Sequence, residues 1–340
     1  MDPKSIRQAR SPMGSLKHIV NAQSLEVTWL AGDGSDRSYF RVSEKGASKS
    51  WVLMQLGDVD RKALEKQNYD WVHLQEVLRK SGVRVPQLFR ALPEHGEILI
   101  EDCKDTSFEQ AIRKYSNTLD SKNIEELYLK AFAVIAKMLK IRGSTHDFWC
   151  KRSFDKDKLS WELSFFVAKY LEDYLSLTLK DTEKCQLLED IQNLSGFLAS
   201  RPQFFVHRDF HSRNLMLRDD DLIVIDFQDA RLGPCAYDVV SLCFDSYVPI
   251  DLSSRRKLMS EAKYFLSRTV DPILDQELTI TANAMLLQRQ LKALGSFAFL
   301  TLEKSRGDFL KYAEHAIVTL DGIYDKRWPF LSGTLLEKIH

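Results

Sequence analysis

The chain has 340 residues, 44% of them hydrophobic, and its 48 basic residues are balanced by 48 acidic ones. Such a chain can bury a sizeable core, and its zero net charge excludes a strong overall field that would attract nucleic acid or an anionic membrane. The five cysteines are an odd number without C-x-x-C spacing, which argues against a disulfide framework and a zinc site.

The first residues, MDPKSIRQARSPMGS, lack the apolar core and the cleavage site of a signal peptide. No stretch of the sequence approaches the about 18 consecutive apolar residues of a membrane span. We therefore expect a cytoplasmic protein without a nucleic-acid or membrane partner, and the sequence leaves its oligomeric state open.

The first hundred residues favour strands and one helix. Strand-forming residues gather in four segments, 26–30, 38–43, 51–56 and 97–101. Between the last two segments, apolar residues at helical spacing over 61–81 predict a helix that ends at Gly82. We expect an antiparallel sheet with one helix, and we assign residues 1–103 to this first lobe.

Helical periodicity dominates from Ser107 onwards, over 124–141, 159–179, 183–198, 255–269 and 275–303. Two short strand candidates, 215–218 and 222–225, are joined by acidic turn residues and predict a hairpin. We assign residues 104–340 to a second, mainly helical lobe. The predicted fold class is therefore α+β, with two lobes, of which the first is small and antiparallel β.

Two motifs flank the predicted hairpin. Residues 207–214, HRDFHSRN, fit the kinase catalytic-loop pattern H-R-D-L-x-x-x-N with Phe for Leu, and an Asp-Phe pair begins at Asp226. Phosphoryl transfer requires a cation on the phosphates and a group that orients the attacking hydroxyl. We predict that Asp209 orients the hydroxyl, that Asn214 and Asp226 bind Mg²⁺, and that ATP is the donor. The alternative is an ordinary hairpin with polar ends, but the two motifs occur together and in order.

Other residues of the catalytic-loop motif have two interpretations each. His211 could contact the transferred phosphate or the substrate, or it could be a hydrogen-bonded scaffold residue. Arg213 could stabilise phosphate charge through its planar guanidinium, whereas a loop-bracing arginine is the more common case. We place His211 and Arg213 among the catalytic candidates and expect His207 to be scaffold.

Two segments of the first lobe are candidates for nucleotide binding. Gly32, Gly34 and Ser35 lie in a turn between two strand candidates, where backbone N–H groups could contact phosphates, although such a turn is often only a hairpin. Glu101 and Cys103 follow an apolar strand at the lobe junction. Backbone groups there could pair with adenine, or the segment could be a core strand that meets a loop.

Over residues 32–320 the chain resembles the aminoglycoside phosphotransferase and choline kinase superfamily, which has the two-lobed protein-kinase-like fold. It is most similar to the bacterial anomeric sugar kinases, through HRDFHSRNLM at 207–216, VIDFQDARLGPCAYDVVSL at 224–242, RVPQL at 84–88 and LQRQLKALGSFAFL at 287–300. Those enzymes phosphorylate N-acetylmuramate and N-acetylglucosamine at C1 in cell-wall recycling. The resemblance implies that Asp238 braces the catalytic loop and that Asp229, Asp245 and Tyr247 lie at a sugar site.

The chain departs from these families at two positions. Superfamily members commonly carry a lysine on the third strand, but this chain has Met54 at that position. The anomeric sugar kinases also lack that lysine. Gln290 stands where those sugar kinases lead us to expect His. Open alternatives are a kinase of aminoglycosides, choline or a similar small molecule, and a pseudokinase that binds nucleotide without turnover. A protein kinase is disfavoured because only a short segment separates Asp226 from Pro234.

Overall fold

The computed structural model describes residues 25–32, 37–46, 49–118, 120–303 and 309–323. Contacts divide the chain into two units, Met1–Asp105 with Met216–Gln228, and Thr106–Leu215 with Asp229–His340. The two lobes predicted from the sequence are 1–103 and 104–340, and the structural units differ from them mainly in one segment. Residues 216–228 associate with the first unit, although they lie far along the chain.

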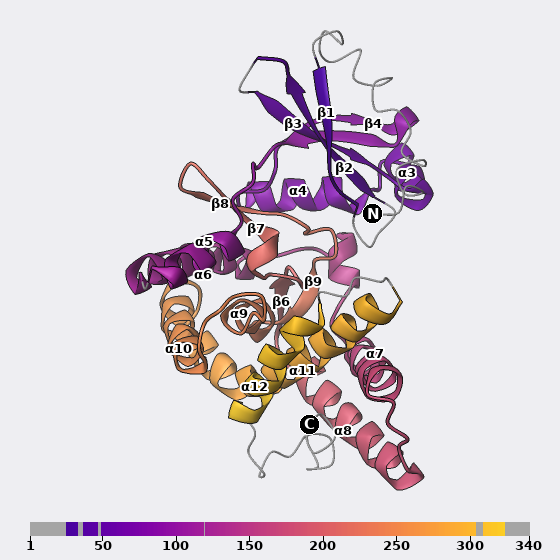
Figure 1. Cartoon of the computed structure of the whole chain (residues 1–340), viewed down its shortest axis with the longest axis vertical. Coiled ribbons are helices and arrows are strands. Elements are labelled where there is room, and N and C mark those ends of the chain that lie inside the picture. Colours follow the sequence, from indigo (N-terminus) through magenta and orange to yellow (C-terminus); the bar gives the residue numbers. More distant parts are fainter. Residues whose placement is uncertain (1–24, 33–36, 47–48, 119, 304–308, 324–340) are drawn as a thin grey trace. The chain divides into compact units, whose positions relative to one another are not determined.

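The described part of the first unit contains an antiparallel sheet in the order β1-β2-β3-β5-β4 (Figure 1). Its strands are β1 (Leu25–Gly32), β2 (Ser38–Glu44), β3 (Ser50–Gln55), β4 (Leu88–Leu92) and β5 (Glu97–Glu101). One face packs a core that includes Phe40, Val42, Leu53 and Leu99. The antiparallel sheet is confirmed, and β4 adds a strand that the sequence analysis does not include.

The single helix predicted over 61–81 is wrong. The structure has two helices, α3 (Asp58–Glu65) and α4 (Asp70–Lys80). Between them Gln67 has a φ of 56°, in the left-handed region where an α-helix cannot continue. α4 buries Trp71, Leu74 and Leu78. The apolar spacing therefore predicts this helix correctly, but places its start at residue 61 instead of Asp70.

The hairpin formed by β7 (Leu215–Arg218) and β8 (Asp221–Val224) is confirmed. Its turn residues Asp219 and Asp220 have φ values of 50° and 65°, the pair of positive values that a type I′ hairpin turn requires. Within the first unit, the Val224 N–H donates to the Arg84 carbonyl at 2.8 Å. The ring of Phe227 lies 5.2 Å from that of Trp71.

The second unit is mainly helical, as predicted (Figure 1). Its helices in the described residues are α5 (Phe108–Asn117), α6 (Ser121–Leu139), α7 (Lys156–Phe166), α8 (Asp181–Ala199), α9 (Ala236–Cys243), α10 (Leu252–Thr269), α11 (Ile273–Leu302) and α12 (Ala313–Ile323). A π-helical segment, Val167–Tyr174, continues α7 and ends before the predicted limit of 179. Two short strands, β6 (Gln203–Val206) and β9 (Arg231–Pro234), pair antiparallel.

Helix α11 is the longest helix that the described residues form, and it contacts α7, α9, α10 and α12. Buried leucines line much of its length, including Leu286, Leu287, Leu291 and Leu294. Gly295 allows the closest approach, because a Cβ built there would lie 2.8 Å from the Cα of Phe166 at the end of α7. This close packing leaves α11 and the end of α7 little room to shift relative to each other at this point.

Gly295→Ala is therefore expected to lower the free energy of unfolding by about 1–3 kcal/mol, since the added methyl meets the backbone of Phe166. Gly196→Ala in α8 is the matched control. A Cβ at Gly196 has its nearest neighbour at 3.9 Å, so alanine should raise stability by about 0.5–1 kcal/mol through helix propensity. Denaturant unfolding of both variants measures the difference, and equal effects would contradict the proposed close contact.

Within the described residues, no helix is both long enough and apolar enough to cross a membrane.

Candidate active site

The catalytic loop, residues 207–214, follows β6, and Asp238 in the first turn of α9 binds its backbone. The carboxylate of Asp238 accepts the N–H of His207 at 2.6 Å and the N–H of Arg208 at 3.1 Å. Arg208 has a φ of 83°, which costs a non-glycine residue about 1–3 kcal/mol and requires such support. Burial raises the pKa of Asp238 to about 6, although His207 and the two N–H donors act in the opposite direction.

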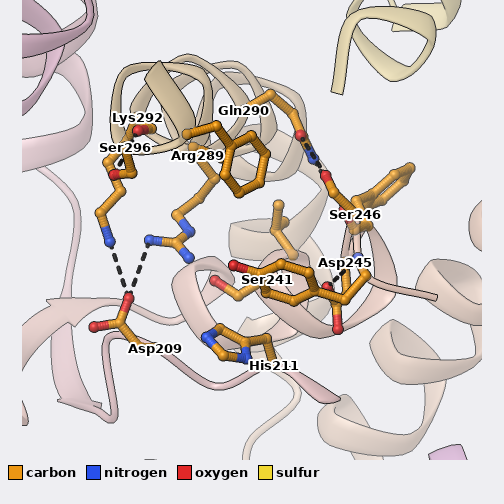
Figure 2. Close-up of a pocket in the computed structure, with 14 residues that line it drawn as sticks. Asp209, His211, Ser241, Asp245, Ser246, Arg289, Gln290, Lys292 and Ser296 are labelled. Atoms are coloured by element: carbon orange, nitrogen blue, oxygen red, sulfur yellow. Dashed lines mark hydrogen bonds and ion pairs between the residues drawn. The ribbon is translucent and has the colours of Figure 1, made fainter. Parts of the chain in front are cut away.

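Asp209 is the next residue of the loop, and two cations from α11 contact its carboxylate (Figure 2). Lys292 Nζ lies 2.9 Å from Asp209 Oδ1, and Arg289 Nη1 lies 3.9 Å from the same oxygen. Burial by itself would raise the pKa of Asp209, but the charges of Lys292, Arg208 and Arg289 outweigh it and hold this pKa well below its ordinary value. Asp209 is therefore ionised at neutral pH.

A pocket lies in the second unit beside Asp209 (Figure 2). Three segments form its wall: the catalytic loop, the end of α9 with the residues that follow it, and one face of α11. The lining residues are Asp209, His211, Val240, Ser241, Phe244, Asp245, Ser246, Tyr247, Arg289, Gln290, Lys292, Ala293, Ser296 and Phe297. The predicted residues Asp209, His211, Asp245 and Tyr247 are thus brought together, whereas Arg289 and Lys292 were not predicted.

Two of the predicted sugar-site residues shape the pocket wall. Asp245 is buried, and its two oxygens accept the N–H groups of Ser212 and Tyr247, each at 2.8 Å. Asp245 thereby joins the catalytic loop to the segment after α9. The ring of Tyr247 meets the ring of His211 edge-on at 5.2 Å between centroids, so the two side chains fix each other's orientation.

Gln290, which stands where the sugar-kinase resemblance leads us to expect His, is buried in the same wall. Its Nε2 donates to the Phe244 carbonyl at 3.0 Å, and its Oε1 accepts the hydroxyl of Ser246 at 3.4 Å. The glutamine therefore ties α11 to the segment that follows α9.

Arg213 points into an aromatic cluster of the second unit. Its Nε donates to Glu109 at 2.8 Å, and its Nη2 donates to the hydroxyl of Tyr312 at 2.6 Å. The guanidinium carbon lies 3.8 Å from the centre of the Tyr247 ring, within the range of a cation–π interaction. This position corresponds to the loop-bracing alternative for Arg213, and a catalytic role stays a prediction.

Asp229 is not among the residues that line the pocket. Its Oδ2 is 3.1 Å from Arg208 Nη1, and its Oδ1 is 3.6 Å from Arg231 Nη2. Arg208 also approaches the buried Glu162 at 3.9 Å. Asp229 therefore neutralises arginines next to the catalytic loop, and a direct contact with substrate stays a prediction.

The two predicted metal ligands, Asn214 and Asp226, belong to different units. In the second unit, Asn214 Nδ2 donates to the Asp209 carbonyl at 2.9 Å, so the amide oxygen is the atom that Asn214 can offer a cation. In the first unit, Asp226 follows β8 with a φ of 62°, and its Oδ1 accepts the Gln228 amide at 2.8 Å. Amide and carboxylate oxygens are the donors that Mg²⁺ takes beside phosphate and water. The donor chemistry of both residues fits such a cation.

The predicted nucleotide-binding residues all lie in the first unit. Gly32 ends β1, whereas Gly34 and Ser35 lie outside the described residues. The carboxylate of Glu101 is engaged by Arg84 and by Arg218, the latter at 2.9 Å. Burial raises the pKa of Cys103 to about 12. Glu101 and Cys103 would therefore serve adenine through their backbones rather than through their side chains.

Met54 is fully buried in β3, where it pairs with Ile98 of β5. It is thus a core residue of the sheet and carries no charge that could act on phosphate.

The fold and the catalytic loop together define the class. An antiparallel sheet precedes a mainly helical unit, and an H-R-D loop places an ionised aspartate in a pocket. This arrangement is that of a kinase with the protein-kinase-like fold.

The chain belongs to the phosphotransferase enzyme family, whose model matches residues 26–271. An N-acetylmuramate/N-acetylglucosamine kinase of Pseudomonas aeruginosa is 27% identical over 304 residues, which cover 86% of this chain and 84% of that protein. A protein of the same name from Neisseria meningitidis is 25% identical over 68% of this chain and 65% of its own length. An ADP-bound aminoglycoside phosphotransferase has the same fold, with a TM-score of 0.58, 15% identity and coverage of 95% of this chain and 99% of its own. Membership makes the chain a phosphotransferase that acts on a hydroxyl group, and it implies an ATP donor and a divalent cation.

Proposed function

We propose that this phosphotransferase moves the γ-phosphate of ATP to the anomeric C1 hydroxyl of N-acetylmuramate or N-acetylglucosamine. The observation that carries the proposal is the ionised Asp209 in the wall of a pocket that also contains hydroxyl and amide side chains, from Ser241, Ser246 and Gln290. An N-acetyl amino sugar offers hydroxyl and amide groups that such side chains can hydrogen-bond. The names of the Pseudomonas and Neisseria relatives support the same acceptor.

In this mechanism Asp209 accepts a hydrogen bond from the C1 hydroxyl and keeps it directed at the phosphorus. Phosphoryl transfer depends mostly on positioning and charge stabilisation, so an ionised carboxylate that orients the hydroxyl is the main contribution of the loop. Asn214 and Asp226 would hold Mg²⁺, which neutralises charge on the phosphates when it is bound. His211 lines the same pocket and is positioned to contact the acceptor.

The remaining assignments are part of the same proposal. Backbone groups at Gly32, Gly34 and Ser35 contact the phosphates of ATP, and those at Glu101 and Cys103 contact adenine. Asp245 and Tyr247 shape the acceptor pocket, while Arg213 and Asp229 support it. The enzyme works in the cytoplasm, in the recycling of cell-wall sugars.

The test compares free N-acetylmuramate and N-acetylglucosamine with their 1-O-methyl glycosides in an ADP-release assay with Mg²⁺ and ATP. We expect turnover of at least one free sugar and none of its glycoside, because the methyl group removes the hydroxyl that Asp209 orients. Phosphorylation of the glycoside at the rate of the free sugar would show that the C1 hydroxyl is not the acceptor. Turnover of aminoglycosides or choline, with no turnover of either sugar, would show that the acceptor is not an N-acetyl amino sugar.

A further inference from the structure

Two cations on α11 face the carboxylate of Asp209 (Figure 2), in a helix segment whose other residues are mostly apolar. Arg289 and Lys292 are three residues apart, a spacing that places two side chains on one face of a helix. Their side chains are 11% and 16% exposed, between the buried residues Leu287, Leu291 and Leu294. Burying two positive charges costs free energy unless a negative group compensates them.

The two cations are not equivalent. Arg289 Nη1 donates to the hydroxyl of Tyr237 at 2.8 Å, and its guanidinium lies over the same ring, so α9 holds this side chain. Arg289 therefore approaches Asp209 no closer than 3.9 Å. Lys292 makes the short contact, a charged hydrogen bond of 2.9 Å from Nζ to Oδ1 of Asp209.

The short contact also distinguishes the two oxygens of the Asp209 carboxylate. Oδ1 receives Lys292, whereas Oδ2 lies 3.9 Å from Arg208 Nε, beyond hydrogen-bond distance. A carboxylate that is held through one oxygen has little freedom to rotate about its terminal bond, whereas a free carboxylate rotates easily. Oδ2 then keeps a constant direction for an incoming hydroxyl.

We propose that Lys292 is a positioning residue for phosphoryl transfer, which holds Oδ1 of Asp209 so that Oδ2 receives the acceptor hydroxyl. The inference rests on the proposed role of Asp209, and it does not depend on which sugar is the acceptor. The lowered pKa of Asp209 agrees with this role, because the charges of Lys292, Arg208 and Arg289 favour the ionised carboxylate. A purely structural ion pair would stabilise the fold without affecting turnover.

The experiment measures kcat and KM for Lys292→Met and Lys292→Arg by ADP release. Misplacing a catalytic group by a small distance can reduce the rate by about 100-fold, so Lys292→Met should lower kcat by about 10- to 100-fold. KM for ATP should stay within about twofold, because Lys292 contacts the loop aspartate rather than nucleotide-binding residues. Lys292→Arg should recover part of the lost kcat because it restores a cation at Oδ1.

Lys169→Met is the matched control. Lys169 is a partly buried lysine with ion pairs of 2.8 Å to Asp173 and 2.7 Å to Glu303, and it does not line the pocket. Its kcat should equal that of the wild type. Should Lys292→Met fail to fold, as measured by denaturant unfolding, Lys292→Gln takes its place with the same expected decrease.

A double-mutant cycle with Asp209→Asn decides between positioning and a separate role. If Lys292 acts through Asp209, Lys292→Met should lower the residual kcat of the Asp209→Asn protein by less than about threefold. A kcat for Lys292→Met equal to that of the wild type, or an undiminished effect in the Asp209→Asn background, would overturn the inference. If the wild type uses another acceptor, the same variants are compared with that acceptor. A wrong sugar assignment can therefore be distinguished from a wrong role for Lys292.

Discussion

Asp209→Asn is expected to lower kcat by about 10²- to 10⁴-fold, the range over which general acid–base groups contribute. The amide can neither accept the hydroxyl proton nor carry the negative charge that Lys292 and Arg289 surround in the structure. Binding of ATP should change by no more than about twofold, because Asp209 belongs to the acceptor pocket. Single-turnover kinetics together with nucleotide titration measure the two quantities separately.

Asp173→Asn is the control for this prediction. Asp173 also accepts a hydrogen bond from a lysine at 2.8 Å, that of Lys169 four residues earlier, but it lies on the π-helical segment and does not line the pocket. Both variants lose a lysine–carboxylate pair, and only Asp209→Asn should lose turnover. If Asp209→Asn keeps more than about half of the wild-type kcat, Asp209 does not orient the acceptor.

Asp226→Ala is expected to reduce kcat by about 10²-fold or more and to raise the Mg²⁺ concentration needed for half-maximal turnover, since a carboxylate ligand is lost. The φ of 62° at Asp226 strains alanine, whereas asparagine tolerates this region. Asp226→Asn therefore serves as the variant that keeps the backbone while it removes the charge. Metal titration with both variants measures the effect, and removal of the cation by a chelator should stop the wild type.

Asp219→Gly provides the control within the same hairpin. Asp219 is 86% exposed, and its φ of 50° suits glycine, so the turn should persist. Its Mg²⁺ dependence should match that of the wild type. A variant of Asp226 with unchanged Mg²⁺ dependence and turnover would exclude this residue as a metal ligand.

The sequence predicts the fold where local patterns are clear. Strands β1, β2, β3 and β5 and the β7–β8 hairpin follow from alternating or β-branched runs bounded by turn residues. β4 is not predicted because its sequence, LFRAL, does not alternate between apolar and polar residues, and Phe89, its second residue, is 47% exposed. α9 escapes because all eight of its residues are buried, which leaves no amphipathic pattern to detect.

Some residues of the candidate site can likewise be predicted from the sequence, and others cannot. Asp209 and His211 stand within two residues of each other in a motif, and the motif is visible in the sequence. Lys292 lies 83 residues after Asp209, and charged residues on a helix usually indicate a solvated face. Its signal is a pair of cations in the mostly apolar segment 284–300, and only tertiary packing shows what that pair faces.

The division of the chain into units has a consequence for synthesis on the ribosome. Phe227 packs beside Trp71, and Arg218 reaches Glu101, so a nascent chain of residues 1–105 has neither partner yet. Domains generally fold as units during synthesis, which proceeds at about 5–20 residues per second. The first unit is complete only after more than a hundred further residues, including helices α5 to α8, have been synthesised and its last segment, 216–228, has left the exit tunnel. During that interval Trp71 lacks the ring that later packs beside it, and transiently uncovered apolar surface of this kind favours aggregation.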